Sequence, residues 1–171
     1  IVIFFITFLG FVDDVIGGLN HLFKFYFLSF SIVILLITNN NLIVDTAGVY
    51  FVDMLLNNYY FSFFITFIII SGFINASNIS DGANGILSGV ASIFLLVVYL
   101  KTNEYYFFIT FKILFIFYLY NVFISKVFLG DSGSYFIGFL ISTLGLYFYN
   151  ESLFSAGFLG SLLSYPCIEI S

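Results

Sequence analysis

Long runs of apolar residues alternate with short polar islands along this chain of 171 residues. The runs lack the two-residue alternation of a barrel strand, and lipid offers no partners for backbone polar groups, so helices are expected. A spanning helix needs roughly 20 apolar residues, and several runs are shorter. The pattern predicts seven helical segments: Ile1–Val12, Leu22–Thr38, Tyr59–Ala76, Gly85–Leu100, Tyr105–Ile124, Tyr135–Tyr149 and Leu153–Ile170.

The polar stretches between these segments are predicted to be links. They are Asp13–His21, Asn39–Asn58, Ser77–Asn84, Lys101–Glu104, Ser125–Ser134 and Asn150–Ser152. No repeat, proline-rich linker or charge run divides the chain. We therefore predict an all-α, polytopic transmembrane helical bundle of about seven spanning segments, forming one domain over residues 1–171.

Composition supports a membrane protein and excludes other classes. Residues are 62% hydrophobic and 8% charged, whereas a soluble domain has about 25% charged residues. A net charge of −5 with four lysines excludes nucleic-acid binding. A lone cysteine, Cys167, excludes an internal disulfide framework. Because the chain opens inside one apolar run and stops beside another, we interpret it as an internal part of a longer protein.

Three polar islands fall on one face of the membrane when crossings are counted along the predicted segments. They are Asp13-Asp14, residues 75–85 and residues 126–134. Lys24 and Lys126 lie on this face and Lys101 on the other, a slight positive-inside bias that favours the cytoplasm. The islands are thus predicted to form one site on the cytoplasmic face.

The islands contain four aspartates, which are costly near lipid and are usually kept for a task. Asp13, Asp14, Asp81 and Asp131 would form an anionic pocket suited to Mg²⁺, which binds through one or two carboxylates plus substrate phosphates. The neighbouring glycines let backbone amides approach a phosphate. Three asparagines can hydrogen-bond a base, sugar or phosphate: Asn75, Asn78 and Asn84. Magnesium, phosphate and a bilayer together suggest phosphoryl transfer involving a lipid.

Each island alone also has a simpler interpretation. Asp13-Asp14 suits a solvated helix end, Gly130–Ser134 suits a turn, and Asp81 or Asn84 suits a cap for the segment that begins at Gly85. Lys112 lies within an apolar segment and is interpreted as snorkelling or as a packed polar contact. The remaining isolated polar groups are assigned to solvated loops: His21, Asp45, Asp53, Glu104 and Glu151.

Taken together and in order, the islands resemble the motifs of the polyprenyl-phosphate N-acetylhexosamine-1-phosphate transferases, glycosyltransferase family 4. The resemblance rests on Asp13-Asp14 with Leu19 and Lys24, on residues 75–85, and on Asn121 with residues 127–134. It implies that a UDP-amino sugar gives its sugar-1-phosphate to undecaprenyl phosphate and releases UMP, with Mg²⁺, at the cytoplasmic face of the bacterial inner membrane. This step starts cell-wall or surface polysaccharide synthesis. Homodimerisation is a further expectation from the family.

The resemblance also implies roles for individual residues. Asp13 would be a base or an acceptor-phosphate contact, with Asp14 working beside it, and Asp131 with Asp14 would bind the metal. Asp81 would organise the metal site and contact the nucleotide sugar. Phe128 would stack on uracil, and Lys24 would meet a phosphate. The other positions expected to bind substrate are Asn75, Asn78, Asn84 and Asn121.

The chain departs from the family pattern at several points. Asn84 stands where many members have aspartate, and Pro166 with Glu169 resembles a Pro-x-x-Asp position. The family's earliest helices and its histidine-rich loop are missing from residues 1–171, so we expect this part alone to be inactive.

Two other functions remain open from the residues themselves. A secondary transporter would use intramembrane carboxylates and broken helices, but it should also show an internal repeat with matching carboxylates, which the sequence lacks. A non-catalytic membrane scaffold would tolerate substitution of Asp13, Asp14 and Asp131.

Overall fold

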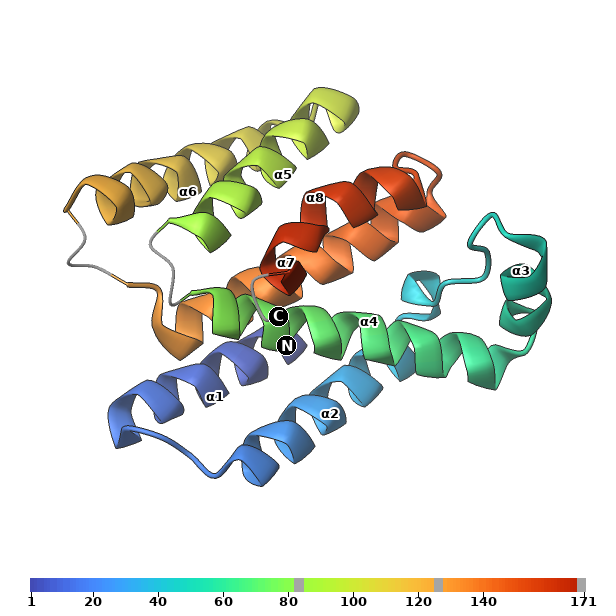
Figure 1. The fold of residues 1–171 in the computed structure, drawn as a ribbon, viewed down its shortest axis with the longest axis horizontal. Helices are drawn as coiled ribbons and strands as arrows, with labels where there is room; N and C mark the ends of the chain where they lie inside the picture. The colour runs from blue at the N-terminus through green and yellow to red at the C-terminus, as the bar shows by residue number, and fades with distance from the viewer. Residues whose placement is uncertain (82–84, 125–127, 169–171) are drawn as a thin grey trace.

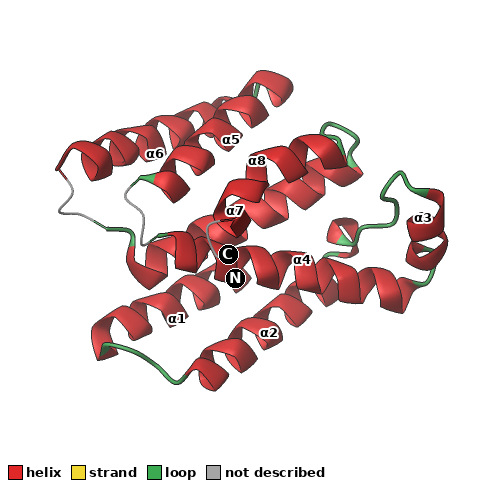
Figure 2. Cartoon of the chain, in the orientation of Figure 1, coloured by secondary structure: helices red, strands yellow, loops and turns green. Residues whose placement is uncertain are grey.

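The computed structural model describes residues 1–81, 85–124 and 128–168, and every regular element in these ranges is helical (Figures 1 and 2). The predicted all-α fold is confirmed. The elements are α1 (Val2–Ile16), α2 (His21–Thr38), the short 3₁₀ helix η1 (Asn40–Leu42), α3 (Tyr50–Leu56), α4 (Tyr59–Ser80), α5 (Ile86–Thr102), α6 (Tyr105–Ile124), α7 (Gly130–Asn150) and α8 (Ala156–Ile168).

All seven predicted segments are helices, but several of their predicted ends are wrong. Helix α1 continues through Asp13-Asp14, α4 continues to Ser80, and α7 begins at Gly130. The polar islands were assigned to links because they interrupt the apolar pattern. Asp13-Asp14 and residues 75–80 instead belong to the polar ends of α1 and α4, and residues 130–134 belong to the start of α7, where the backbone is helical.

The predicted link Asn39–Asn58 is also wrong, because it contains η1 and α3. Asp53 lies in α3, and its carboxylate accepts a hydrogen bond from the Ala47 backbone N–H at 2.6 Å. This carboxylate therefore organises the turn before α3 and is not simply a solvated loop residue. By contrast, Asp45, Glu104 and Glu151 are exposed between helices, as predicted.

Helix α7 lies at the centre of the molecule and packs against both α1 and α4 (Figure 1). One face of α7 contributes Tyr135 and Phe139 to a core with α1, α2 and α4. Another face contributes Ile137 and Ile141 to a second core with α5, α6 and α8. Helix α7 thus joins the two halves of the bundle, and its position determines where the residues at its two ends lie.

Two glycines allow this close packing of α7. A Cβ added to Gly10 of α1 would lie 2.5 Å from the carbonyl oxygen of Asp131, at the start of α7. A Cβ on Gly138 of α7 would lie 3.0 Å from the Cα of Ile74 in α4. Such distances are shorter than van der Waals contact, so any larger residue would push the helices apart.

Three helices of the described chain, α2, α4 and α6, are long and apolar enough to cross a membrane, and α5 is apolar but shorter. By length and composition the described residues thus contain fewer individual spans than the seven expected. Large side chains such as Phe30, Ile116 and Phe123 are exposed on α2 and α6. An apolar exterior of this kind suits contact with lipid. Lys112 also lies on α6, exposed, with its ammonium 4.2 Å from the centre of the Phe108 ring.

The substitution Gly10→Ala tests the close contact between α1 and α7. We expect it to lower the free energy of unfolding by about 1–3 kcal/mol, because the added methyl group overlaps the backbone of α7. Thermal unfolding in detergent measures the change. The matched control is Gly72→Ala in α4, where a Cβ meets nothing within 4 Å. Equal stability of the two variants would contradict the packing argument.

Candidate active site

Four helix ends meet around the predicted carboxylates. The end of α1 supplies Asp13 and Asp14, and the first turns of α2 supply Lys24. The end of α4 supplies Asn78 and Asp81, while the start of α7 supplies Asp131 and Ser134. Residues from three separate islands, up to 118 positions apart in the sequence, therefore contact one another.

Lys24 links two of the carboxylates. Its ammonium contacts the Asp13 carboxylate and lies 3.1 Å from Oδ2 of Asp131. The turn between α1 and α2 brings Lys24 to this place: Gly17 ends α1 in a left-handed conformation, as is common for helix C-termini. Asn20 then caps α2 by accepting a hydrogen bond from the Leu22 backbone N–H.

Asp13 is the most buried of the four carboxylates, with 5% of its surface exposed. Besides Lys24, it accepts a hydrogen bond from the backbone N–H of Leu19. A buried carboxylate stays charged only when such partners compensate for the loss of water. Asp13 is therefore held as an anion, facing Asp131 across the Lys24 ammonium.

Asp14 faces a different part of α7. Its Oδ1 accepts a hydrogen bond from the Asp131 backbone N–H at 2.9 Å, and its Oδ2 accepts one from Ser132 at 3.1 Å. Gly130 precedes these amides in a left-handed conformation, with φ of +65°. A Cβ at Gly130 would lie 2.9 Å from Oδ2 of Asp14, so a larger residue there would collide with the carboxylate.

Asp81 directly follows α4 and is half-buried. Burial, together with the negative charges of Asp131 and Asp14, raises the pKa of its carboxyl to about 6, although a hydrogen bond from the Gly130 backbone opposes the rise. Asp81 is not at the N-cap position of α5, which is Gly85, and the other predicted cap, Asn84, lies outside the described residues. Asp81 faces the acidic cluster instead.

Ser134 is a site residue that sequence reasoning did not single out. Its hydroxyl donates a hydrogen bond to Oδ1 of Asn78 at 2.5 Å, and the serine is fully buried. This bond joins α4 to α7 next to the carboxylates. The Gly-Asp-Ser-Gly-Ser run contained Ser134, but nothing in that run indicated which of its two serines turns inward.

Three other predicted substrate residues lie on α4, near the end of α6 and just before α7. Asn75 is exposed and donates to the Ser71 carbonyl of its own helix at 2.8 Å. Asn121 is buried near the end of α6, and Phe128 is 56% exposed two residues before α7. Asn84 lies outside the described residues. Substrate binding by these four residues stays a prediction.

Within the described ranges, no group of three or more histidine, cysteine or acidic side chains is arranged to hold a metal ion. The protein side chains there do not form a complete cation site by themselves. Magnesium is nevertheless commonly bound by one or two carboxylates, with substrate phosphates and water completing its shell. Asp131, whose negative charge raises the pKa of Asp81, fits that kind of donor set together with Asp81.

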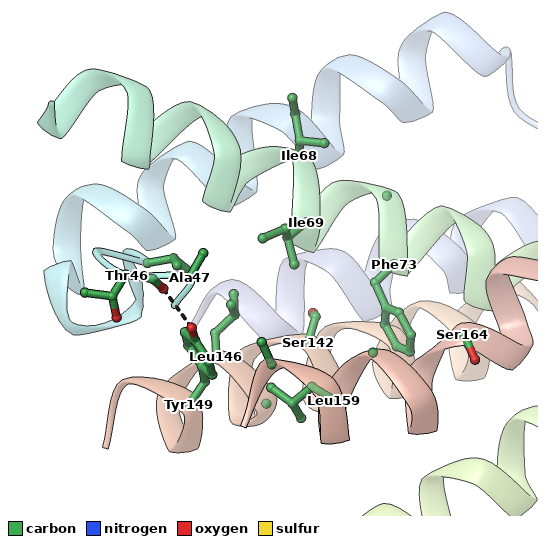
Figure 3. A pocket seen from close by; sticks show the side chains of 15 residues that line it. Thr46, Ala47, Ile68, Ile69, Phe73, Ser142, Leu146, Tyr149, Leu159 and Ser164 are labelled. Atoms are coloured by element: carbon green, nitrogen blue, oxygen red, sulfur yellow. Dashed lines mark hydrogen bonds between the residues drawn. The ribbon is translucent and has the colours of Figure 1, made fainter. Parts of the chain in front are cut away.

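A separate cavity of about 510 Å³ lies between α4, α7, α8 and the segment before α3 (Figure 3). Its lining is almost entirely apolar and includes Ile69, Phe73 and Leu146, and a hydrogen bond from Tyr149 to the Thr46 carbonyl closes one side at 2.8 Å. Among the described residues, no carboxylate or amine lines this space. It is therefore distinct from the acidic cluster.

A family model described as glycosyl transferase family 4 matches residues 1–149. The chain belongs to this family. The match includes the ends of α1 and α4 and the start of α7, so all four aspartates of the site lie within the family region.

Curated relatives agree with this assignment. The chain is 34% identical over 93 residues to a phospho-N-acetylmuramoyl-pentapeptide-transferase of Fervidobacterium nodosum, covering 52% of this chain and 30% of the relative. It is 33% identical over 99 residues to an undecaprenyl-phosphate alpha-N-acetylglucosaminyl 1-phosphate transferase of Thermotoga maritima, covering 58% of this chain and 31% of the relative. The chain thus matches less than a third of these relatives' length. No solved structure matches the chain significantly.

The raised pKa of Asp81 predicts how its removal changes stability with pH. A carboxyl with a folded pKa of about 6 and an ordinary value of 3.8 stabilises the fold when protonated, and this contribution is lost as pH rises from about 4 to 6. In metal-free detergent, Asp81→Asn should therefore gain stability relative to wild type across that window and keep the gain above pH 6. Thermal unfolding at several pH values measures it.

The same change at the exposed Glu151, Glu151→Gln, controls for the loss of one negative charge. A difference between Asp81→Asn and wild type that stays constant from pH 4 to 8 would contradict the burial of the Asp81 carboxyl among like charges.

Proposed function

We propose that this protein transfers a sugar-1-phosphate from a UDP-amino sugar to undecaprenyl phosphate and releases UMP. The observation that carries the proposal is the meeting of Asp13, Asp81 and Asp131 with Lys24 at four helix ends, in a chain that belongs to glycosyl transferase family 4. The names of the relatives from Fervidobacterium nodosum and Thermotoga maritima support the same reaction class.

In this reaction a phosphate oxygen of the lipid attacks the sugar-bearing phosphorus of the UDP-sugar. A new P–O bond forms, the bond to the bridging oxygen breaks, and UMP leaves with that oxygen and its electron pair. Such a transfer depends mainly on the positioning of the two phosphates and on the neutralisation of their charge. The protein must therefore bring two anions together inside a cluster that is itself anionic.

We assign a separate role in binding the two phosphates and the sugar to each of the described side chains. Asp131 and Asp81 would bind Mg²⁺ together with the diphosphate of the donor. Magnesium supplies charge neutralisation for the leaving UMP. Asp13 would contact the lipid phosphate or accept its proton, and Lys24, which is already shared between Asp13 and Asp131, would exchange a carboxylate partner for a phosphate oxygen. Asn78, held by Ser134, would hydrogen-bond the nucleotide sugar.

We propose that the site lies at the cytoplasmic face of a bacterial inner membrane. There the water-soluble UDP-sugar can reach the lipid phosphate while the lipid tail stays in the bilayer. The product would start a cell-wall or surface polysaccharide. The transporter and scaffold alternatives gain no specific support from the structure, and membership of a transferase family favours catalysis.

The experiment follows UMP release by the full-length protein in detergent with undecaprenyl phosphate, UDP-N-acetylglucosamine and Mg²⁺. We expect release that EDTA abolishes, and we expect Asp131→Asn to lower kcat by on the order of 10²–10³-fold, as the loss of a central charge-stabilising group does in other enzymes. Asp45→Asn, which changes an exposed carboxylate in the link before α3, should keep full activity.

Other UDP-amino sugars would be tried if this donor gave no product. If folded protein released no UMP with any of these donors, the transferase proposal would be refuted. Turnover that survives both EDTA and Asp131→Asn would refute the magnesium site while leaving the reaction class standing.

A further inference from the structure

We propose that Asp14 is a positioning residue: its carboxylate caps the N-terminus of α7 from the neighbouring helix α1 and so holds Asp131 in place. This assignment differs from the metal-binding or proton-accepting role that the sequence suggests for Asp14. Its consequence for catalysis rests on the function proposed above, whereas the capping itself does not.

The start of α7 lacks a cap of its own. The N-cap position is Leu129, whose side chain cannot accept a hydrogen bond, and no side chain of α7 caps the helix. The first amides of a helix have no partner within that helix. At α7, the amides of Asp131 and Ser132 are instead bound by the two carboxylate oxygens of Asp14, at 2.9 and 3.1 Å.

A carboxylate is well suited to this place. The N-terminus of a helix carries a partial positive charge, so an anion there is stabilised in addition to its hydrogen bonds. Both oxygens of Asp14 already have an N–H donor, and the Lys24 ammonium contacts Asp13 and Asp131 instead. The two adjacent aspartates therefore do different work: Asp13 faces the charged side chains, and Asp14 faces the backbone of α7.

Two glycines allow Asp14 and the start of α7 to come this close. Gly130 lies beside the Asp14 carboxylate with no room for a Cβ, which would be 2.9 Å from Oδ2. Gly10 is one turn before Asp14 on α1, and a Cβ there would lie 2.5 Å from the Asp131 carbonyl oxygen. Positions four apart lie on the same face of a helix. Gly10 and Asp14 thus form one surface of α1 that receives the first turn of α7.

Capping has a consequence for the Asp131 side chain. The backbone amide of Asp131 is one of the two groups that Asp14 binds, while its carboxylate faces Lys24. Movement of the first turn of α7 would therefore move the carboxylate proposed to bind magnesium. A displacement of about 1 Å in such a group is enough to cost on the order of 10²-fold in rate.

The test compares Asp14→Asn and Asp14→Ala with Asp13→Asn in the full-length protein. Asparagine keeps one side-chain oxygen at the length of aspartate and can still accept from an α7 amide, whereas alanine has no side-chain acceptor. Hydrogen exchange at the amides of Asp131 and Ser132 is the first readout. We expect exchange to accelerate by roughly five- to tenfold in Asp14→Ala and to stay closer to wild type in Asp14→Asn. Asp53→Ala, which removes a carboxylate bound to the Ala47 amide in another part of the chain, should leave these two amides unaffected.

Transferase activity is the second readout. Asp14→Asn should lose much less activity than Asp13→Asn, and Asp14→Ala should lose more activity than Asp14→Asn, in the same order as the exchange rates. Equal and severe loss of activity in Asp14→Asn and Asp14→Ala, with exchange at α7 unchanged in both, would overturn the proposal, because Asp14 would then act through its charge on the reacting groups.

The two proposals fail in different ways. If the folded wild-type protein shows no transferase activity, the proposed function fails, and exchange at Asp131 and Ser132 in Asp14→Ala still decides the capping role. If the wild type is active and exchange does not respond to Asp14→Ala, the capping role fails and the transferase stands.

Discussion

The compensation of negative charge where α1, α4 and α7 meet is the constraint on which the rest of this structure depends. Carboxylates from three helix ends lie close together beside strongly apolar helices, where an unpaired anion is costly. The described residues balance them in two ways. Lys24 contacts Asp13 and Asp131, and the first amides of α7, together with Gly130, bind Asp14 and Asp81. The start of α7 thus acts as a second source of positive charge, and its position relative to α1 and α4 must be held closely.

The packing of the bundle fixes the start of α7 relative to α1 and α4. Helix α7 belongs to both apolar cores because its opposite faces contact different groups of helices. Gly10 and Gly138 let α1 and α4 approach its backbone, and the bond between Ser134 and Asn78 joins α7 to α4 beside the site. A site made from helix ends is only as rigid as the contacts between those helices. The outer surfaces of α2 and α6, by contrast, keep large apolar side chains exposed, as expected for helices that face lipid.

This arrangement separates the chemistry from the apolar space of the molecule. The carboxylates, the lysine and the asparagine lie at one meeting point, whereas the described residues that line the cavity between α4, α7 and α8 include no carboxylate or amine (Figure 3). The proposed reaction, between a charged nucleotide and a lipid phosphate, would need such a polar centre beside an apolar bundle. Burial and the negative charges of Asp131 and Asp14 raise the pKa of Asp81, so a ligand that brings positive charge to this centre would favour the ionised carboxylate.

The sequence by itself determined the class of the fold, the seven main helices and the residues that carry charge into the apolar bundle, because hydrophobic runs and intramembrane aspartates are strong local signals. It did not determine where the helices end, because polar residues at helix ends resemble loops until the partners of their side chains are known. Helix α3 was missed because its 7 residues are too few to stand out as a helical run. Nor did it separate Asp13 from Asp14. Adjacent residues on a helix point about 100° apart, so one faces Lys24 and the other the backbone of α7, and only the packing of α1 against α7 decides which. Asn75 and Asn78 differ for the same physical reason, since only Asn78 contacts α7 through Ser134.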